Sequence, residues 1–156
     1  MTTISLAPPL RALRTSAPRP GALEPTGFGR AVRVRTLMGW QPVERLMAGD
    51  LVLDKAGNLH ELRGVRQSRV DGAFVIRIRR KGRAPLVVGA AQVLGSDDWR
   101  AQVIFGQAAA CPAARMVDGT AIRRGQPRGA MLYHLQFDTT VCLDVDGATA
   151  IIPAAQ

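Results

Sequence analysis

The chain has 156 residues, of which 47% are hydrophobic and only 4% aromatic, and it carries a formal net charge of +9 at pH 7. This length suits one domain whose core is built from aliphatic side chains. No apolar run approaches the roughly 18 residues of a membrane span, and the N-terminal residues lack the apolar segment of a signal peptide. A cytoplasmic location is therefore the default expectation, and secretion by another route stays open.

Residues 1–25 hold five of the ten prolines and show little periodic pattern, which predicts a flexible, Pro-rich tail. The folded domain is expected to span residues 26–156. Residues 31–36 alternate small apolar and basic side chains, as a half-buried strand does. A turn is expected at 37–40, a helical turn or bent segment at 43–46, and another turn at Gly49 and Asp50 before a strand at 51–54.

Further strands are predicted, in chain order, at 61–70, 73–80, 85–94, 100–106, 120–124, 130–137, 139–147 and 149–152. Segment 107–119 is either a short helix or a buried loop, because its alanines favour a helix while Pro112 restricts where a helix can begin. With eight to ten short strands and almost no helical periodicity, the predicted fold class is all-β, a compact barrel-like or pseudo-symmetric sheet fold.

The two cysteines, Cys111 and Cys142, are too few for a disulfide framework and lack the spacing of metal ligands. Both are expected to be small hydrophobic residues of the core, with a reactive thiol as the alternative. The sequence has no zinc signature, no phosphate-binding loop and no glycine-rich dinucleotide motif, so no cofactor or metal is expected. The chain is expected to be a monomer.

Positive charge is concentrated in one window. Eight basic residues and one acidic residue lie between Arg63 and Arg83. The alternating arginines of segment 73–80 fit the solvent-facing side of a strand, which requires no ligand. They also define a candidate binding surface for an unidentified protein partner or another acidic surface. Nucleic acid is an alternative partner, although no helix-turn-helix, zinc finger or aromatic RNA-binding signature accompanies the charge. The candidate binding residues are Arg77, Arg79, Arg80, Lys81 and Arg83.

A series of short motifs lies within residues 27–152. In order, it comprises GF, VRVRT, PVERLMAGDLVL, LVVGAAQ, WRAQVIFG and YHLQFD. The third motif, residues 42–53, is the most specific for one family. The other motifs are short, and they support an assignment only because they occur in this order. This series resembles the Hint (Hedgehog/Intein) domains of bacteria, in the variety found alone or at the C-terminus of alphaproteobacterial proteins. The resemblance implies a β-rich, horseshoe-like domain with a pseudo-two-fold arrangement.

The resemblance also implies a self-cleaving mechanism. In the family, a Cys or Ser that opens the domain attacks the carbonyl of the preceding residue, and a His protonates the leaving amide nitrogen. Counting back from Thr36 without a gap, the family's Phe falls on Phe28 and the nucleophile position on Gly27. The Ser/Thr position falls on Gly89 and the His position on Gln92. Glycine cannot attack, and a Gln amide does not exchange protons near neutral pH, so no catalytic residue is expected at the family's positions.

Three other residues are weaker catalytic candidates. Thr26 precedes Gly27, but a Thr hydroxyl is a poor nucleophile without a base. His134 belongs to a predicted closing strand, where a lone His is usually a hydrogen-bonded structural residue, and Asp138 directly follows that strand. Thr140 stands where many relatives have a second His. The resulting hypothesis is a degenerate Hint domain that has lost self-cleavage and acts as a non-catalytic binding or structural module. Residual autoprocessing through Thr26 and nucleic-acid binding remain the alternatives.

Overall fold

The computed structural model describes residues 24–96 and 109–155. Within them it contains thirteen strands, three short 3-10 turns and no α-helix, which confirms the predicted all-β class. The strands are β1 (Arg33–Thr36), β2 (Gly39–Pro42), β3 (Leu51–Leu53), β4 (Leu59–Glu61), β5 (Gly64–Val70), β6 (Val75–Arg80), β7 (Arg83–Gly89), β8 (Val93–Ser96), β9 (Ala109–Pro112), β10 (Ile122–Arg124), β11 (Ala130–Gln136), β12 (Val141–Val145) and β13 (Ala148–Ile152). The turns are η2 (Val43–Arg45), η3 (Gly72–Phe74) and η4 (Ala113–Met116).

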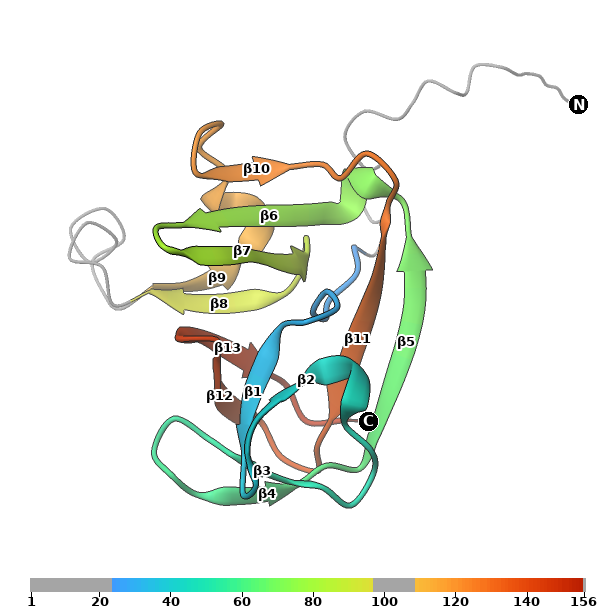
Figure 1. Cartoon of the computed structure of the whole chain (residues 1–156), viewed down its shortest axis with the longest axis vertical. Helices are drawn as coiled ribbons and strands as arrows, with labels where there is room; N and C mark the ends of the chain where they lie inside the picture. Colours follow the sequence, from blue (N-terminus) through green and yellow to red (C-terminus); the bar gives the residue numbers. More distant parts are fainter. Residues whose placement is uncertain (1–23, 97–108, 156) are drawn as a thin grey trace, which may run out of the picture.

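The described strands pair only in the antiparallel sense. Eight of them form a curled sheet in the order β4-β3-β1-β12-β13-β8-β9, with β2 beside β1, while β10, β6 and β7 form a second sheet. Strands β5 and β11 lie side by side as a long ribbon along one flank of the molecule (Figure 1). Phe28 links this ribbon to the second sheet, because its main chain bridges Val88 of β7 and Tyr133 of β11.

Strand β1 shows how the sequence pattern becomes structure. Val34 and Thr36 are buried, whereas the arginine before each of them is exposed, as the alternation predicts. The Thr36 hydroxyl closes the following turn, because it donates to the Gly39 carbonyl at 2.7 Å and accepts from the Met38 amide at 3.1 Å. Gly39 has a φ of +102°, a conformation that favours glycine. The helical turn predicted at 43–46 is present as η2.

Several expectations differ from the structure. More strands are present than predicted, because a turn divides segment 85–94 into β7 and β8, and because β2, β4 and β9 are short hairpin strands with a weak pattern. Segment 107–119 contains β9 and η4 rather than a helix. Cys142 is exposed and Cys111 is only half-buried, so placing both in the core was wrong: strand alternation turns Cys142 outward beside the buried Leu143. The predicted strand at 100–106 lies outside the described residues, as does most of the predicted tail. No helix in the described part is long and apolar enough to cross a membrane.

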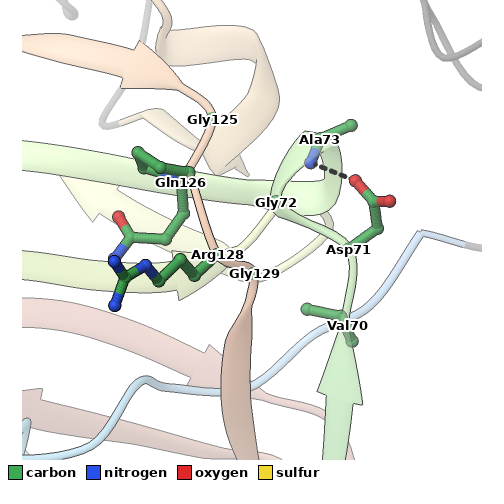
Figure 2. A pocket seen from close by; sticks show the side chains of 9 residues that line it. Val70, Asp71, Gly72, Ala73, Gly125, Gln126, Arg128 and Gly129 are labelled. Atoms are coloured by element: carbon green, nitrogen blue, oxygen red, sulfur yellow. Dashed lines mark hydrogen bonds between the residues drawn. The ribbon is translucent and has the colours of Figure 1, made fainter.

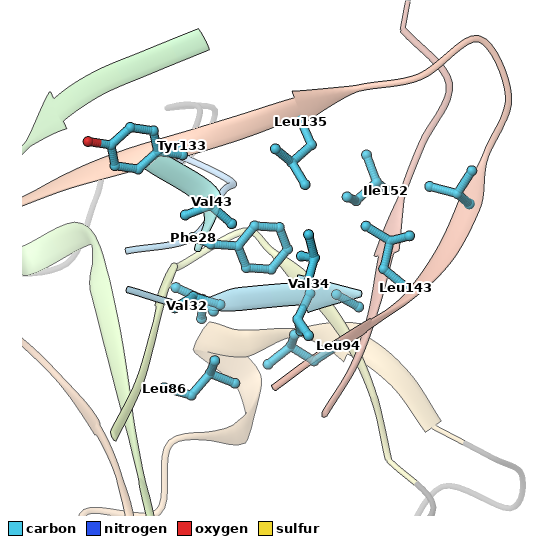
Figure 3. Close-up of a cluster of buried hydrophobic side chains, with 14 of the residues drawn as sticks. Phe28, Val32, Val34, Val43, Leu86, Leu94, Tyr133, Leu135, Leu143 and Ile152 are labelled. Atoms are coloured by element: carbon cyan, nitrogen blue, oxygen red, sulfur yellow. The ribbon is translucent and has the colours of Figure 1, made fainter. Parts of the chain in front are cut away.

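The hydrophobic core gathers aliphatic side chains around Phe28, which is fully buried (Figure 3). Val34, Leu135, Leu143 and Ile152 belong to the same cluster, so its members come from the large sheet and from the β11 ribbon. Burial of one large apolar side chain typically contributes about 1.5–3 kcal/mol. Because Phe28 follows Gly27 directly, packing of its ring fixes the course of the main chain at Gly27.

Candidate functional site

The main chain around Gly27 is held between β7 and β11. The Phe28 amide donates to the Tyr133 carbonyl at 3.0 Å, and the Tyr133 amide donates back to the Phe28 carbonyl at 2.8 Å. On the other side, the Gly89 amide donates to the Gly27 carbonyl at 2.9 Å. The main-chain groups on both sides of Gly27 are therefore hydrogen-bonded to regular strands, and the peptide is rigidly placed.

The side chain of Gln92 reaches the amide nitrogen of Gly27. The Gly27 N–H donates to Gln92 Oε1 at 2.9 Å, while Gln92 Nε2 donates to the carbonyls of Val93 and Ile151 at 3.2 Å each. Gln92 is only 3% exposed, so these bonds replace water at both ends of the amide. The structure thus brings together the two positions that the resemblance pairs, although 65 residues separate them in sequence.

Gly27 and Gly89 are sterically required where they stand. Gly27 has a φ of +106°, and a Cβ there would lie 2.8 Å from the Tyr133 carbonyl oxygen. A Cβ on Gly89 would overlap the carbonyl of Pro25. That carbonyl accepts a hydrogen bond from the Ala91 amide at 2.8 Å. The chain before Gly27 therefore occupies the space that a Ser or Thr side chain at position 89 would need.

A Thr–His contact lies next to this peptide. Thr26 Oγ1 is 3.0 Å from His134 Nδ1, and His134 Nε2 is 3.3 Å from Ser68 Oγ. The family's His position is Gln92, but β11 brings a different histidine, His134, beside Thr26. Both residues line an open cavity of about 500 Å³, which also contains Arg66.

Burial lowers the pKa of His134 below its ordinary value, and the positive charge of Arg66 lowers this pKa further. The imidazole is therefore neutral at pH 7, with one ring nitrogen free to accept a proton. A neutral His that contacts a hydroxyl is the arrangement of a base with a weak nucleophile.

Asp138 and Thr140 do not join this site through any hydrogen bond of the described residues. Asp138 is exposed and accepts from Arg63 Nε at 2.7 Å. The Thr140 hydroxyl accepts from the Ala154 amide at 3.3 Å. Their contacts hold the loop after β11 and the segment after β13, which is a structural role.

Four of the five candidate binding residues fall into two groups, and the fifth, Lys81, is exposed in the turn between β6 and β7. Arg80 and Arg83 donate to the Asp146 carbonyl at 2.6 and 2.7 Å, so they hold the β12–β13 turn. Arg77 and Arg79 are exposed on the other side of β6. There they adjoin Arg123 of β10, a residue that the sequence pattern did not single out. Only the register between two distant strands reveals this third arginine, since nothing in its local sequence marks it.

A wider cavity of about 650 Å³ lies between the turn after β5 and the turn before β11 (Figure 2). Asp71 is its only acidic lining residue, and its carboxylate accepts from the Ala73 amide at 2.9 Å. The lining contains no His, Ser, Thr or Cys. The described residues also contain no group of three or more His, Cys, Asp or Glu side chains that could hold a metal. Asp71 is therefore the only described lining residue of this cavity that could act as a base or a nucleophile, and its carboxylate caps the turn.

Comparison with known proteins matches the chain to a family. A family model described as "Hint domain" matches residues 26–150. No curated protein matches the sequence closely enough to count as a relative. Among solved structures, the gp41-1 intein covers 81% of this chain and 98% of its own, with a TM-score of 0.57 and 10% identity. A bacterial intein-like domain from Clostridium thermocellum covers 82% and 99%, with a TM-score of 0.57 and 11% identity. At such identities the structural likeness concerns the fold.

Proposed function

Because the chain belongs to the Hint-domain family, we propose that it is a member that keeps the fold but does not cleave the Thr26–Gly27 bond. Its role is that of a non-catalytic binding or structural module. The observation that carries this proposal is the 2.9 Å hydrogen bond from the Gly27 amide to Gln92 Oε1. In the family's reaction that amide nitrogen is the leaving group.

Cleavage of an amide by an internal nucleophile needs two groups. One attacks the carbonyl carbon, and the other protonates the nitrogen as it departs. Gly27 supplies no side chain for the first step. Gln92 presents an acceptor oxygen to the nitrogen, so it has no proton to give and instead stabilises the intact peptide N–H. Both requirements fail at the same bond, which supports loss of the family's reaction.

The same contacts support a structural role. Pro25 is held by the Ala91 amide at 2.8 Å, and the Glu24 carboxylate lies 3.4 Å from Nη2 of Arg124 on β10. The main chain that follows is held at Gly27 and Phe28, because the Gly27 carbonyl accepts from the Gly89 amide and the Phe28 amide donates to the Tyr133 carbonyl. The former cleavage site would thus work as an anchor that keeps the preceding segment attached to the domain.

Intact-mass spectrometry of the purified chain tests this proposal. The protein is incubated at pH 7–8 with dithiothreitol or hydroxylamine, which would release any thioester or ester intermediate. We expect one species with the full-length mass under every condition. Two fragments that meet between Thr26 and Gly27 would contradict the proposal.

A second candidate function, self-cleavage one bond earlier, is favoured by the contact between Thr26 and His134. In this reaction His134 takes the hydroxyl proton, Thr26 Oγ bonds to the Pro25 carbonyl carbon, and the Pro25–Thr26 C–N bond breaks. The proton passes to the Thr26 nitrogen. Water then hydrolyses the ester and releases the Pro25 carboxylate. The Ala91 amide already polarises the Pro25 carbonyl at 2.8 Å.

This second candidate is the weaker one, because no hydrogen bond among the described residues reaches the Thr26 nitrogen that would leave. The same mass measurement distinguishes the two candidates by the position of the cut. A cut between Pro25 and Thr26 that disappears in Thr26→Ala but persists in Ser68→Ala would establish it. An uncut wild-type chain in hydroxylamine would exclude it.

A further inference from the structure

We propose that the outer face of β6 and β10 binds an extended acidic segment of a partner protein through Arg77, Arg79 and Arg123, here named the arginine face. This inference rests on the proposed binding role and specifies the surface and the partner's chemistry. The two strands lie side by side at the end of the molecule opposite the β3–β4 hairpin (Figure 1).

The side chains of the arginine face point away from the core. Ile78 of β6 and Ile122 of β10 are register partners, and both pack against the core cluster. Strand side chains alternate between the two faces, so the arginines beside them project outward. Arg77 and Arg123 are direct register partners. Arg79 lies two residues further along β6, about 7 Å away at the usual rise of a strand.

The close positive charges of the arginine face lower the stability of the fold unless an anion neutralises them. Like charges that are directly opposite on neighbouring strands are destabilising. None of the three arginines forms a salt bridge within the described residues. Arg77 has one long hydrogen bond to Gln126 at 3.4 Å, and Arg123 uses only its Nε, toward the Thr120 carbonyl at 3.1 Å. Most guanidinium donors therefore remain available to an anion.

The three arginines surround a cavity of about 320 Å³. Pro85 and Ala121 contribute apolar surface to it, and none of its lining residues is acidic. The nearby Arg124 also lines the cavity, but it donates to the Ala73 carbonyl at 2.7 Å and pairs with Glu24. The cavity thus combines free positive charge with an apolar floor for the aliphatic part of a bound side chain.

An acidic peptide fits this surface better than nucleic acid. No aromatic side chain lines the cavity, so bases would have no stacking platform. In an extended peptide, every second side chain faces the same way at about 7 Å spacing, which matches Arg77 and Arg79. Guanidinium groups also bind carboxylates in a bidentate manner. At Ile122 the outer edge of β10 is already occupied, because the Asp118 carboxylate accepts from the Ile122 amide and the Asp118 amide donates to the Ile122 carbonyl. The peptide would therefore contact side chains rather than add a strand.

Fluorescence anisotropy with the full-length protein tests this inference. The probe is a fluorescein-labelled ten-residue peptide of alternating Glu and Thr. A peptide of alternating Gln and Thr and a ten-nucleotide single-stranded RNA are the comparison probes. The test variant is Arg77→Gln/Arg79→Gln/Arg123→Gln. The control variant, Arg30→Gln/Arg35→Gln/Arg45→Gln, removes the same three charges from exposed positions elsewhere. Circular dichroism verifies that both variants fold.

We expect the Glu peptide to bind the wild-type protein and the control variant with affinities within about threefold of each other. We expect the test variant to lose at least tenfold in affinity, and the Gln peptide to bind at least tenfold more weakly. Equal losses in both variants would show a general effect of net charge and overturn the proposal. Tighter binding of the RNA than of the Glu peptide would also overturn it. Cleavage at Gly27 would contradict the proposed function without affecting this titration, so the two failures are distinguishable.

Discussion

The amide of Gly27 donates a hydrogen bond to the side-chain oxygen of Gln92 at 2.9 Å, although the residues are 65 positions apart in sequence. This contact joins the start of the domain to the turn between β7 and β8. It occupies the place where the family's reaction needs a proton donor, and it satisfies a buried N–H. Under the proposed function, the contact therefore links the loss of self-cleavage to a gain of stability in one interaction.

Replacement of Gln92 is the first test of this link. Gln92→Leu should lower the free energy of unfolding by about 2–3 kcal/mol, because the Gly27 amide and two carbonyls lose a buried partner. Chemical denaturation measures the loss. Hydrogen exchange should show faster exchange of the Gly27 amide. Gln67→Leu, at an exposed position of β5, is the control and should change stability by less than about 0.5 kcal/mol. An equal loss in both variants would show that the Gln92 contact is unimportant.

A side chain at position 27 should be poorly tolerated. Gly27→Ala combines a left-handed backbone conformation with a Cβ placed 2.8 Å from the Tyr133 carbonyl oxygen. We expect a loss of about 2–4 kcal/mol in thermal or chemical unfolding. Gly57→Ala is a matched control, because Gly57 has a similar φ of +91° and a Cβ at this position would have no neighbouring atom within 4 Å. It should lose only about 1–2 kcal/mol. If Gly27→Ala costs no more than this control, the close approach to Tyr133 does not constrain the site.

Restoration of the family's residues should not restore cleavage. Gly27→Cys with Gln92→His supplies a thiol and an imidazole, but the Cys would meet the Tyr133 carbonyl and the His would lose the bonds to Val93 and Ile151. We expect no thiol-dependent fragments by mass spectrometry. Efficient cleavage by this double variant would show that the backbone of the site adapts readily, and that only two side chains separate this chain from an active one.

The pH dependence of stability should reveal His134. Its folded-state pKa is lowered, so the unfolded chain binds more protons than the folded chain as pH falls. Stability should therefore decrease from about pH 6.5, the usual pKa of His, down to the lowered folded-state pKa, and this contribution should be constant at lower pH. His134→Gln should remove this decrease when unfolding is followed by urea titration between pH 5 and 8. An unchanged pH profile in the variant would contradict a desolvated imidazole at this position.

Adjacent arginines of β6 should behave differently. Arg80 donates to the Asp146 carbonyl at 2.6 Å and to the Ala84 carbonyl at 2.8 Å, so Arg80→Ala should cost about 1–3 kcal/mol in stability. Arg79 makes no side-chain hydrogen bond within the described residues and belongs to the arginine face. Arg79→Ala should leave stability within about 0.5 kcal/mol of wild type and weaken binding of the Glu peptide. Similar melting temperatures for the two variants would remove the distinction between structural and binding arginines.

The all-β class and most strands could be predicted because alternation and turn residues are local signals. Strand β1 and the turn η2 follow directly from such patterns. The family resemblance supplied the pairing of Gly27 with Gln92, which composition and spacing alone could not. The contact of Thr26 with His134 and the position of Arg123 beside Arg77 depend on the register of strands far apart in sequence. The exposure of Cys142 depends on which face of β12 meets the core, and a short apolar segment does not specify that face.

The intact mass of the purified chain after prolonged incubation tests the central proposal most directly. Wild-type protein is kept at 25 °C and pH 7.5 for several days, with and without hydroxylamine, and its mass is followed over time. The proposed loss of self-cleavage predicts a single full-length mass throughout. A growing pair of fragments with the new ends at Thr26 and Gly27 would contradict it.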